Sequence, residues 1–394
     1  MTVTLAEPVT TILTESLIDR CGQRAAGYDR DNRFFSEDFE ELRQAGYLLL
    51  TVPREFGGHG LSLLQTCHEQ RRLAYRAPAT ALATNMHLSW VGVAADLYRM
   101  GDTSLTWLLD EAAAGEVFAA GHGEVGNDLP GLLSTATAER VDGGYRFTGR
   151  KMFGSLSPVW TRLGIHAMDT SDPERPMVVH AFMPRDADGY EIKQTWDTLG
   201  MRAARGDDTI LNGAFVPDRY IGRTVPAGVL DPFLGSIFAW ADLLFGNVYY
   251  AIALRARDLA VASARKRTAL AVSRTMAYHP EIQHMAAQIS LEIEAVGPHL
   301  DQIARDWSDG VDHGQSWASK IVAARYHAVE SAKRVVDLAM DISGGAGMFK
   351  TNELERLYRD VRAGAFHPAN AALVHEIVGK TTLGIELGEQ PRWG

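Results

Sequence analysis

The first third of the chain has the hydrophobic pattern of amphipathic helices. In SEDFEELRQAGYLLL (residues 36–50), apolar residues recur every three positions with polar residues between them. This spacing puts the apolar side chains on one helix face, and Ser36 is the expected N-cap. The Pro/Gly-containing stretch TVPREFGGHGLS then interrupts the pattern. We expect a helical domain over residues 1–118. The apolar residues are Phe39, Leu42, Ala45 and Leu48.

From about residue 119 to 228 the period changes from that of helices to that of strands. STATAERVDGGYRFTGRKMFG (residues 134–154) contains two alternating runs around Asp142-Gly143-Gly144, which is a hairpin signal. MVVHAFMPR and TILNGAFVPDRY have the composition of further strands. The sequence therefore predicts a central β domain over residues 119–228.

The last part, residues 229–394, returns to a helical period. WASKIVAARYHAVESAKRVVDLAM (residues 317–340) has apolar residues near every 3.6 positions and no internal Pro or Gly. A helix of this length suits a packed bundle. Helices, then antiparallel strands, then helices exclude an alternating βαβ fold and predict an α+β protein that is mainly α. The apolar residues of the long helix are Ile321, Val322, Val329, Ala332, Val336 and Ala339.

Composition narrows the class of protein. The chain has 394 residues with 39 Lys and Arg against 49 Asp and Glu, a formal charge of −10. This charge argues against binding to nucleic acid or to an anionic membrane. Cys21 and Cys67 are too few for a disulfide framework and too far apart for a metal-ligand pair. MTVTLAEPVTT has no basic or apolar signal-peptide region, and no stretch approaches roughly 18 uninterrupted apolar residues. We expect a soluble cytoplasmic protein without a metal.

Four ordered stretches resemble the acyl-CoA dehydrogenase superfamily: TVPREFGGHGLS, FTGRKMFGS, LGMRAARGDDTILNGAFVPDR and SGGAGMFKTNELERLYRDVR. Together they extend over nearly the whole chain. The resemblance implies an N-terminal helical domain, a central β-barrel and a C-terminal four-helix bundle. It also implies a homo-oligomer, a dimer or more typically a tetramer, that binds FAD, with FMN as the alternative.

The resemblance also assigns residues to the flavin. Gly126, Asn127 and Asp128 match a loop that touches the cofactor from the barrel, and Phe153 and Ser155 match positions that face the isoalloxazine. Arg267 matches an arginine that reaches the FAD pyrophosphate of a neighbouring subunit, a task that suits a guanidinium because it pairs bidentately with phosphate. A glycine loop is expected to let backbone approach the cofactor, although glycines also commonly end a helix. Its members are Gly344, Gly345 and Gly347.

One feature of a dehydrogenase is absent from the matching positions. A dehydrogenase of this family uses a glutamate to remove the substrate's α-proton. At one family position, after Arg-Asp in RLYRDVRAGAFHPAN, this chain has His367 and Pro368; at the other it has Ala241. The family's CoA-holding Phe-Asp-x-x-Arg begins here at Phe238 and places Asp242 where the arginine is expected. Asp242 is a relocated base only if the alignment is shifted by one residue.

Another branch of the superfamily, the two-component flavin monooxygenases, lacks the glutamate. These enzymes take reduced flavin from a separate reductase and use O₂ to form a C4a-hydroperoxyflavin, which hydroxylates small molecules. RDVRAGAFH resembles their Arg-Asp followed by a histidine near the substrate, so His367 is the first catalytic candidate. Ser155, which can supply a hydroxyl, is the second. Imidazole can take a proton from a phenol or indole N–H, or donate a hydrogen bond. The branch usually has Thr-Gly-Ser in a stretch where this chain has Ala204, Arg205 and Gly206. The hydroxyl that the branch is expected to place near the flavin is therefore absent from these positions.

The sequence therefore predicts a reduced-flavin-dependent monooxygenase acting on an aromatic or heteroaromatic molecule resembling an indole or a phenol. An acyl-CoA dehydrogenase with a relocated base and an inactive flavin-binding relative are the alternatives. Aromatic residues would line the pocket and exclude water. The candidate pocket residues are His87, Trp90, Phe238, Trp240, Asp242 and Tyr249.

Overall fold

The N-terminal part of the chain is helical. The computed structural model describes residues 11–270 and 273–389, so most of the N-terminal stretch MTVTLAEPVTT lies outside the described residues. Side chains cap the N-termini of two of these helices: Thr14 accepts from the Leu17 amide, and Ser62 and Gln65 form a capping box. The prediction for Ser36 is wrong, because Phe35 occupies the N-cap position and Ser36 is the first residue of its helix. The helices are α1 (Glu15–Arg30), α2 (Ser36–Gln44), α3 (Leu63–Arg76), α4 (Pro78–Arg99) and α5 (Thr106–Ala113).

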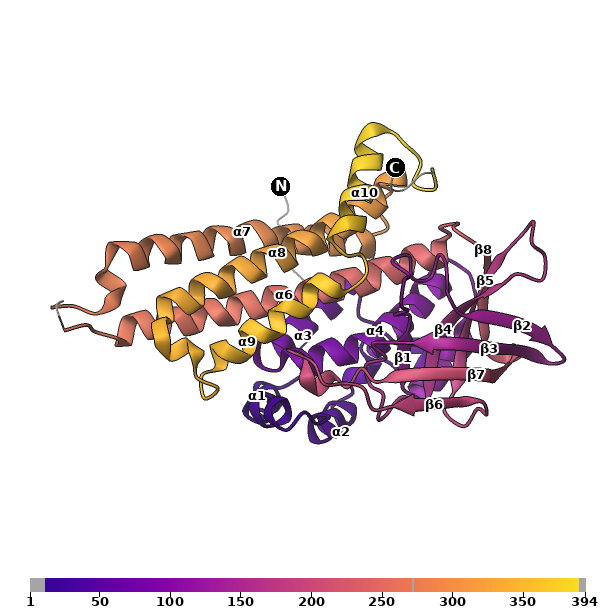
Figure 1. Ribbon diagram of the computed structural model, residues 1–394, viewed down its shortest axis with the longest axis horizontal. Coiled ribbons are helices and arrows are strands. Elements are labelled where there is room, and N and C mark those ends of the chain that lie inside the picture. The colour runs from indigo at the N-terminus through magenta and orange to yellow at the C-terminus, as the bar shows by residue number, and fades with distance from the viewer. Residues whose placement is uncertain (1–10, 271–272, 390–394) are drawn as a thin grey trace.

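In the described part of the chain, eight strands follow and form one sheet, drawn at the right of Figure 1. Its order is β6-β7-β3-β2-β4-β5-β8, with β1 paired to β4. The predicted hairpin is confirmed: Val141 pairs with Gly144, and Gly143 adopts φ +74° in the turn. The pairs β1–β4 and β2–β4 are parallel and the others antiparallel. The strands are β1 (Phe118–Gly121), β2 (Thr137–Val141), β3 (Gly144–Lys151), β4 (Arg162–Asp169), β5 (Met177–Pro184), β6 (Tyr190–Lys193), β7 (Asp208–Pro217) and β8 (Ile221–Pro226).

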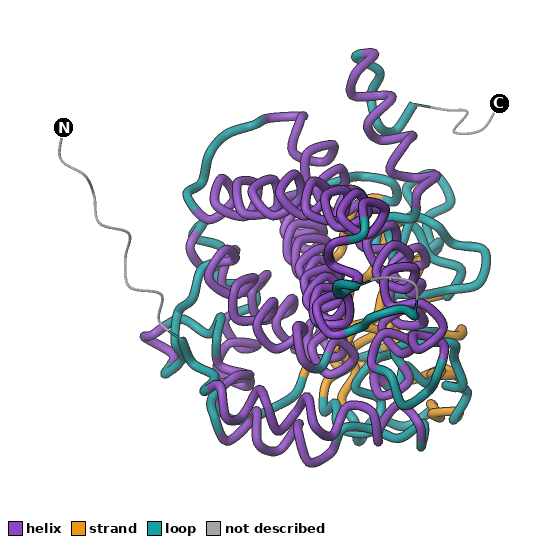
Figure 2. Tube along the Cα trace, turned by 90° about the vertical axis from the view of Figure 1, so that its left-hand side faces the viewer, coloured by secondary structure: helices purple, strands orange, loops and turns teal. Residues whose placement is uncertain are grey.

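The C-terminal part is a helical bundle that Figure 2 shows nearly end-on, with the strands behind it. The six apolar positions predicted from the 3.6-residue period are all buried in α8. The order of helices, strands and helices is the one predicted from the sequence, whereas the exact boundaries of the three domains stay a prediction. The helices are α6 (Pro232–Lys266), α7 (Pro280–Ser308), α8 (Trp317–Ser343), α9 (Glu353–Arg362) and α10 (Ala371–Leu383).

Helix α6 is the central helix of the molecule. It packs against α3, α4, α7 and α8. Within the described part of the chain it is also the one helix long and apolar enough to cross a membrane, with a mean hydropathy of 1.5 over 18 residues. Because 78% of that window is buried inside the protein, its apolar composition is explained by its place in the core.

Candidate functional site

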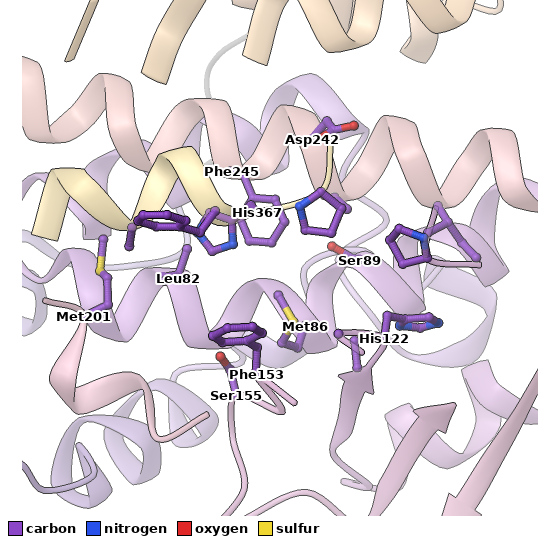
Figure 3. A pocket seen from close by; sticks show the side chains of 18 of the residues that line it. Leu82, Met86, Ser89, His122, Phe153, Ser155, Met201, Asp242, Phe245 and His367 are labelled. Carbon is purple, nitrogen blue, oxygen red and sulfur yellow. The ribbon is translucent and has the colours of Figure 1, made fainter. Parts of the chain in front are cut away.

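A cavity of about 440 Å³ lies where the helices meet the sheet. This volume is within the range of small-molecule sites, roughly 300–1,000 Å³. Figure 3 shows Phe153 and Ser155 facing His367 and Phe245 across it. Segments far apart in the sequence therefore meet here. The lining comes from α4 (Leu82, Met86, Ser89, Trp90, Val93), the end of β1 (His122), residues 153–155, residues 196–201 and α6, and from Arg359 to Pro368.

Two segments of the wall have unusual backbone conformations. Phe153 and Leu156 have φ of +58° and +68°, and Met201 and Arg205 have φ of +53° and +46°. Such values cost energy in residues other than glycine and gather at functional sites. The two segments are joined, because the Leu156 amide donates to the Ala204 carbonyl at 3.3 Å. This pairing holds the strained backbone beside the cavity.

The strained segment presents an aromatic ring and a hydroxyl. Phe153 is 52% exposed, and its ring meets Trp196 edge-on at a centroid distance of 6.1 Å. Within the described residues, Ser155 Oγ has no hydrogen-bond partner. Residues 204–206 are Ala, Arg and Gly and have no hydroxyl to offer the cavity. Ala204 is buried, and the Arg205 guanidinium pairs with Asp207. Thr198, which also lines the cavity, donates its hydroxyl to the Gly200 carbonyl at 2.9 Å, whereas the Ser155 hydroxyl is not used in this way.

The Arg-Asp of the C-terminal motif fastens α9 to the rest of the site. Arg359 pairs with Asp29 of α1 through both guanidinium nitrogens, at 2.8 and 2.6 Å. Asp360 accepts from the Met201 amide at 2.6 Å. Gly200 is required because a Cβ there would collide with the Arg359 carbonyl. These contacts fix the strained segment against the helix that leads into the His367 turn.

His367 follows the 3₁₀ turn Ala363–Phe366 and lines the cavity. Its ring stacks on Phe245 at 4.3 Å with 13° between the planes, and its Nε2 is 2.6 Å from Tyr249 Oη. Burial, with a smaller effect of the Arg325 cation, lowers the pKa of His367 to about 3. The imidazole is therefore neutral over the physiological pH range.

Arg325 of α8 holds the turn that carries His367. This guanidinium is 2% exposed and donates to the Gly364 carbonyl at 2.9 Å, to the His367 carbonyl at 3.0 Å and to the Ala369 carbonyl. Asp242 lies 3.4 Å from Arg325 Nε as its counter-ion. One buried cation thus ties three carbonyls of a single turn.

Asp242 belongs to the wall of the cavity, but its carboxylate is turned away from solvent. Both carboxyl oxygens are buried, and neither makes a side-chain hydrogen bond within the described residues. Burial, partly offset by Arg325, raises the pKa of Asp242 to about 7. Asp242 thus lines the cavity with both carboxyl oxygens closed to solvent.

The raised pKa of Asp242 predicts a pH dependence of stability. Because the folded state holds this proton more tightly than the unfolded state, the stability that Asp242 contributes is complete below about pH 4 and is lost as the pH rises to about 7. Against Asp242→Asn, which does not titrate, the wild-type free energy of unfolding should fall over this window. The slope is at most about 1.4 kcal/mol per pH unit. Urea denaturation from pH 4.5 to 8 measures it, and parallel curves for the two proteins would contradict it.

The loop predicted to touch the cofactor is built around a buried ion pair. Glu124 pairs with Lys151 and accepts from the Thr135 amide at 2.9 Å and from Asn127 Nδ2 at 2.8 Å. Asn127 also donates to Leu133 and accepts from Leu129, so its side-chain amide is used within the loop. Gly126, Asn127 and Asp128 are set back from the cavity, while Pro130 and Gly131 line it.

Several predicted pocket residues lie elsewhere. His87 bridges the Leu48 carbonyl and the Phe118 amide, and Trp240 donates to Asp96 at 2.7 Å; neither lines the cavity, so these two predictions are corrected. Each is adjacent in sequence to a lining residue, and a helix turns about 100° per residue. Tyr249 lies behind His367. Phe238 and Trp90 do line the cavity, and Trp90 is also packed in the core with Phe182.

The residues predicted to lie near the flavin pyrophosphate form a separate cluster at the ends of α6 and α8. Arg267 donates to the Ile342 carbonyl at 2.6 Å, and a Cβ at Gly344 would collide with Arg267 Nη1. Gly345 and Gly347 belong to the same 3₁₀ turn, Gly344–Met348. None of these residues lines the cavity. Within one copy of the chain, these residues are therefore separate from the cavity that Phe153 and His367 line.

Sequence reasoning missed Arg325, Phe245 and Met201. Arg325 carried a signal, because it interrupts the apolar face of the predicted helix between Val322 and Val329. A charge at a core position needs a buried partner. Nothing in the local pattern identified Phe245 or Met201.

Comparison with known proteins places the chain among flavoenzymes. The models of the acyl-CoA dehydrogenase N-terminal and C-terminal domains match residues 10–106 and 238–367. A putative acyl-CoA dehydrogenase of Bacillus subtilis is 29% identical over 370 residues, covering 92% of this chain and 94% of that one. An amino sugar nitrososynthase of Streptomyces peucetius is 30% identical over 346 residues, covering 84% and 82%.

Comparison with solved structures also finds flavoenzyme relatives. The crystal structure of a nitrososynthase from Micromonospora carbonacea var. africana matches with a TM-score of 0.83 and 25% identity, over 97% of this chain and 100% of that one. The relatives are flavin-dependent oxidoreductases and include monooxygenases, nitrososynthases and dehydrogenases.

Proposed function

Because the chain belongs to the acyl-CoA dehydrogenase family, we propose that it is the oxygenase of a two-component flavin monooxygenase. It takes reduced flavin from a separate reductase and hydroxylates an aromatic or heteroaromatic small molecule. The observation that carries this proposal is the polar chemistry of the cavity. His367, a neutral imidazole, stands where a dehydrogenase places its carboxylate, and Asp242, the one acidic residue lining the cavity in the described part of the chain, has both oxygens buried.

The walls fit a flavin ring. Phe153 offers an exposed aromatic face, and Ser155 Oγ has no hydrogen-bond partner among the residues that the structure describes, as expected of groups that a planar polar ring would cover. FAD is the proposed form, with FMN as the alternative. When bound in its reduced form, the flavin supplies activation of O₂. The residues of this chain hold the ring, orient the substrate against His367 and exclude water through an apolar lining that includes Leu82, Met86 and Phe245.

Stopped-flow absorbance tests the proposed reaction. The protein is mixed with enzymatically reduced FAD or FMN, then with oxygenated buffer containing indole or phenol. We expect oxidation in more than one phase, with a transient absorbing species, and a hydroxylated product for at least one probe. Direct single-phase return to oxidised flavin without product would overturn the proposal. Flavin binding with neither product nor a changed oxidation rate would identify an inactive relative.

An acyl-CoA dehydrogenase remains the second candidate, since Asp242 lies in the cavity wall with a raised pKa. To act as a base, its carboxylate, buried beside Arg325, would have to become accessible to the substrate. Bleaching of bound oxidised flavin by butyryl-CoA under nitrogen distinguishes this candidate. The monooxygenase proposal expects no bleaching.

Arg267 is proposed to reach the flavin pyrophosphate of a second copy of the chain in a dimer or tetramer. The Arg267→Ala variant should weaken FAD binding by about 1.5–3 kcal/mol, the range for a hydrogen bond to a charged group. Fluorescence titration with FAD measures this, and Arg265→Ala, at an exposed position two residues away, is the matched control. Unchanged affinity, or a strictly monomeric wild-type protein by light scattering, would remove Arg267 from the site.

A further inference from the structure

The hydrogen bond between Tyr249 and His367 determines which nitrogen of the imidazole carries the proton. Tyr249 is fully buried on α6, and its hydroxyl makes one side-chain hydrogen bond within the described residues, to His367 Nε2 at 2.6 Å. His367 Nδ1 has no partner there. His367 lines the cavity, so Nδ1 is the ring nitrogen left for a ligand.

Only one arrangement of protons satisfies both groups. A phenol has one O–H to donate, and a neutral imidazole has one N–H donor and one acceptor nitrogen. If Nε2 carried the proton and donated to Tyr249, the tyrosine proton would be buried without an acceptor, which costs about 1–3 kcal/mol. If Tyr249 donates to Nε2, the buried pair is satisfied and the imidazole proton is on Nδ1. Hydrogen-bond satisfaction is the established way to assign a histidine tautomer.

The surroundings keep the imidazole uncharged and its ring fixed. The charged or titratable groups near it are the Arg325 cation of α8, Asp242 of α6 paired with that cation, and the Tyr249 hydroxyl. Protonation of His367 would place a second cation beside Arg325, which is unfavourable. The stacked Phe245 ring and the Arg325 hydrogen bond to the His367 carbonyl at 3.0 Å restrict rotation of the ring and of its backbone.

We propose that Tyr249 is a positioning residue that holds His367 in the Nδ1–H form, so that His367 donates a hydrogen bond to an acceptor atom in the cavity and does not remove a proton from the substrate. The ligand group beside His367 is then a lone-pair acceptor, such as a carbonyl, a phenolate or another oxygen. As a statement about the reaction this inference rests on the proposed monooxygenase. As a statement about the tautomer it stands on the protein alone.

The tautomer is measured without any reaction. In protein labelled with ¹⁵N-histidine, the two ring nitrogens of a neutral imidazole have separate chemical shifts for the protonated and the unprotonated position. The His367 signals are assigned by their loss in His367→Gln. We expect Nδ1 to be protonated from pH 6 to 8, and Tyr249→Phe to give a mixture of the two tautomers. A protonated Nε2 or an imidazolium in the wild-type protein would overturn the inference whatever the enzyme's activity.

Two isosteric substitutions test the role of the donor. The amide nitrogen of asparagine can occupy the place of histidine Nδ1, and that of glutamine the place of Nε2. If His367 acts as a donor through Nδ1, His367→Asn should keep product per reduced flavin within about tenfold of wild type, while His367→Gln should fall roughly 10²-fold, as when a preorganised donor is lost. Equal losses in both variants would make His367 a proton acceptor or a packing residue. Should neither wild type nor variants form product, the proposed function fails while the tautomer result is unaffected.

Discussion

Replacing His367 with alanine should lower product formed per reduced flavin by roughly 10²–10³-fold while leaving flavin binding intact. The imidazole is the polar group that the C-terminal turn brings into the cavity, opposite Ser155 and Phe153. Without it, the substrate loses the donor that orients it, and reduced flavin is oxidised without hydroxylation. Hydrogen peroxide release should therefore rise as product falls. Product by chromatography and peroxide by a coupled assay, from the same reaction, measure this partition.

The matched control is His375→Ala. His375 is an exposed histidine of α10, outside the lining of the cavity, and it should show wild-type coupling. Since burial and Arg325 lower the pKa of His367 to about 3, the loss should be the same from pH 6 to 8. Wild-type coupling in the alanine variant would make His367 structural. A loss that appears only at one end of this pH range would indicate a titrating base in place of a neutral donor.

Replacing Arg325 with methionine should destabilise the protein by about 3–5 kcal/mol, the cost of breaking one side of a buried ion pair. Methionine has a similar length but no donors, so three carbonyls of the His367 turn lose their partner and Asp242 loses its counter-ion. Without Arg325, Asp242 avoids burial of a charge only by binding a proton. The loss should therefore be larger at pH 8 than at pH 6, and urea denaturation at the two pH values measures both.

Arg334→Met on the same helix is the control for this substitution. Arg334 pairs with Glu292 at 2.7 Å, but its side chain is 52% exposed, so the cost should be below about 1 kcal/mol. If Arg325→Met is too unstable to purify, the double variant Arg325→Met with Asp242→Asn removes the unpaired charge and should recover part of the stability. Equal urea midpoints for the wild type and Arg325→Met would show that the buried pair does not hold the turn.

The sequence by itself determined the elements and their order. The three-residue spacing that begins at residue 36 and the apolar face of residues 317–340 depend only on local geometry, as does the Asp142-Gly143 turn, although α2 ends at Gln44, before the spacing does. Phe153, Ser155 and His367 were named through the family resemblance, which short motifs carry, and the structure places all three in the lining of the cavity.

Only the tertiary structure decided which faces of the central helices line the cavity and which residues control His367. Helices α4 and α6 are buried on nearly every side, so the hydrophobic period could not separate Met86 from His87 or Ala241 from Trp240. Tyr249 is 118 positions from His367 in the sequence, and Arg325 is 42. A pattern within one short segment cannot predict contacts between residues so far apart in the sequence. The packing of α6 and α8 around one turn brings the phenol, the guanidinium and the imidazole together, and this packing makes the histidine neutral and sets its proton.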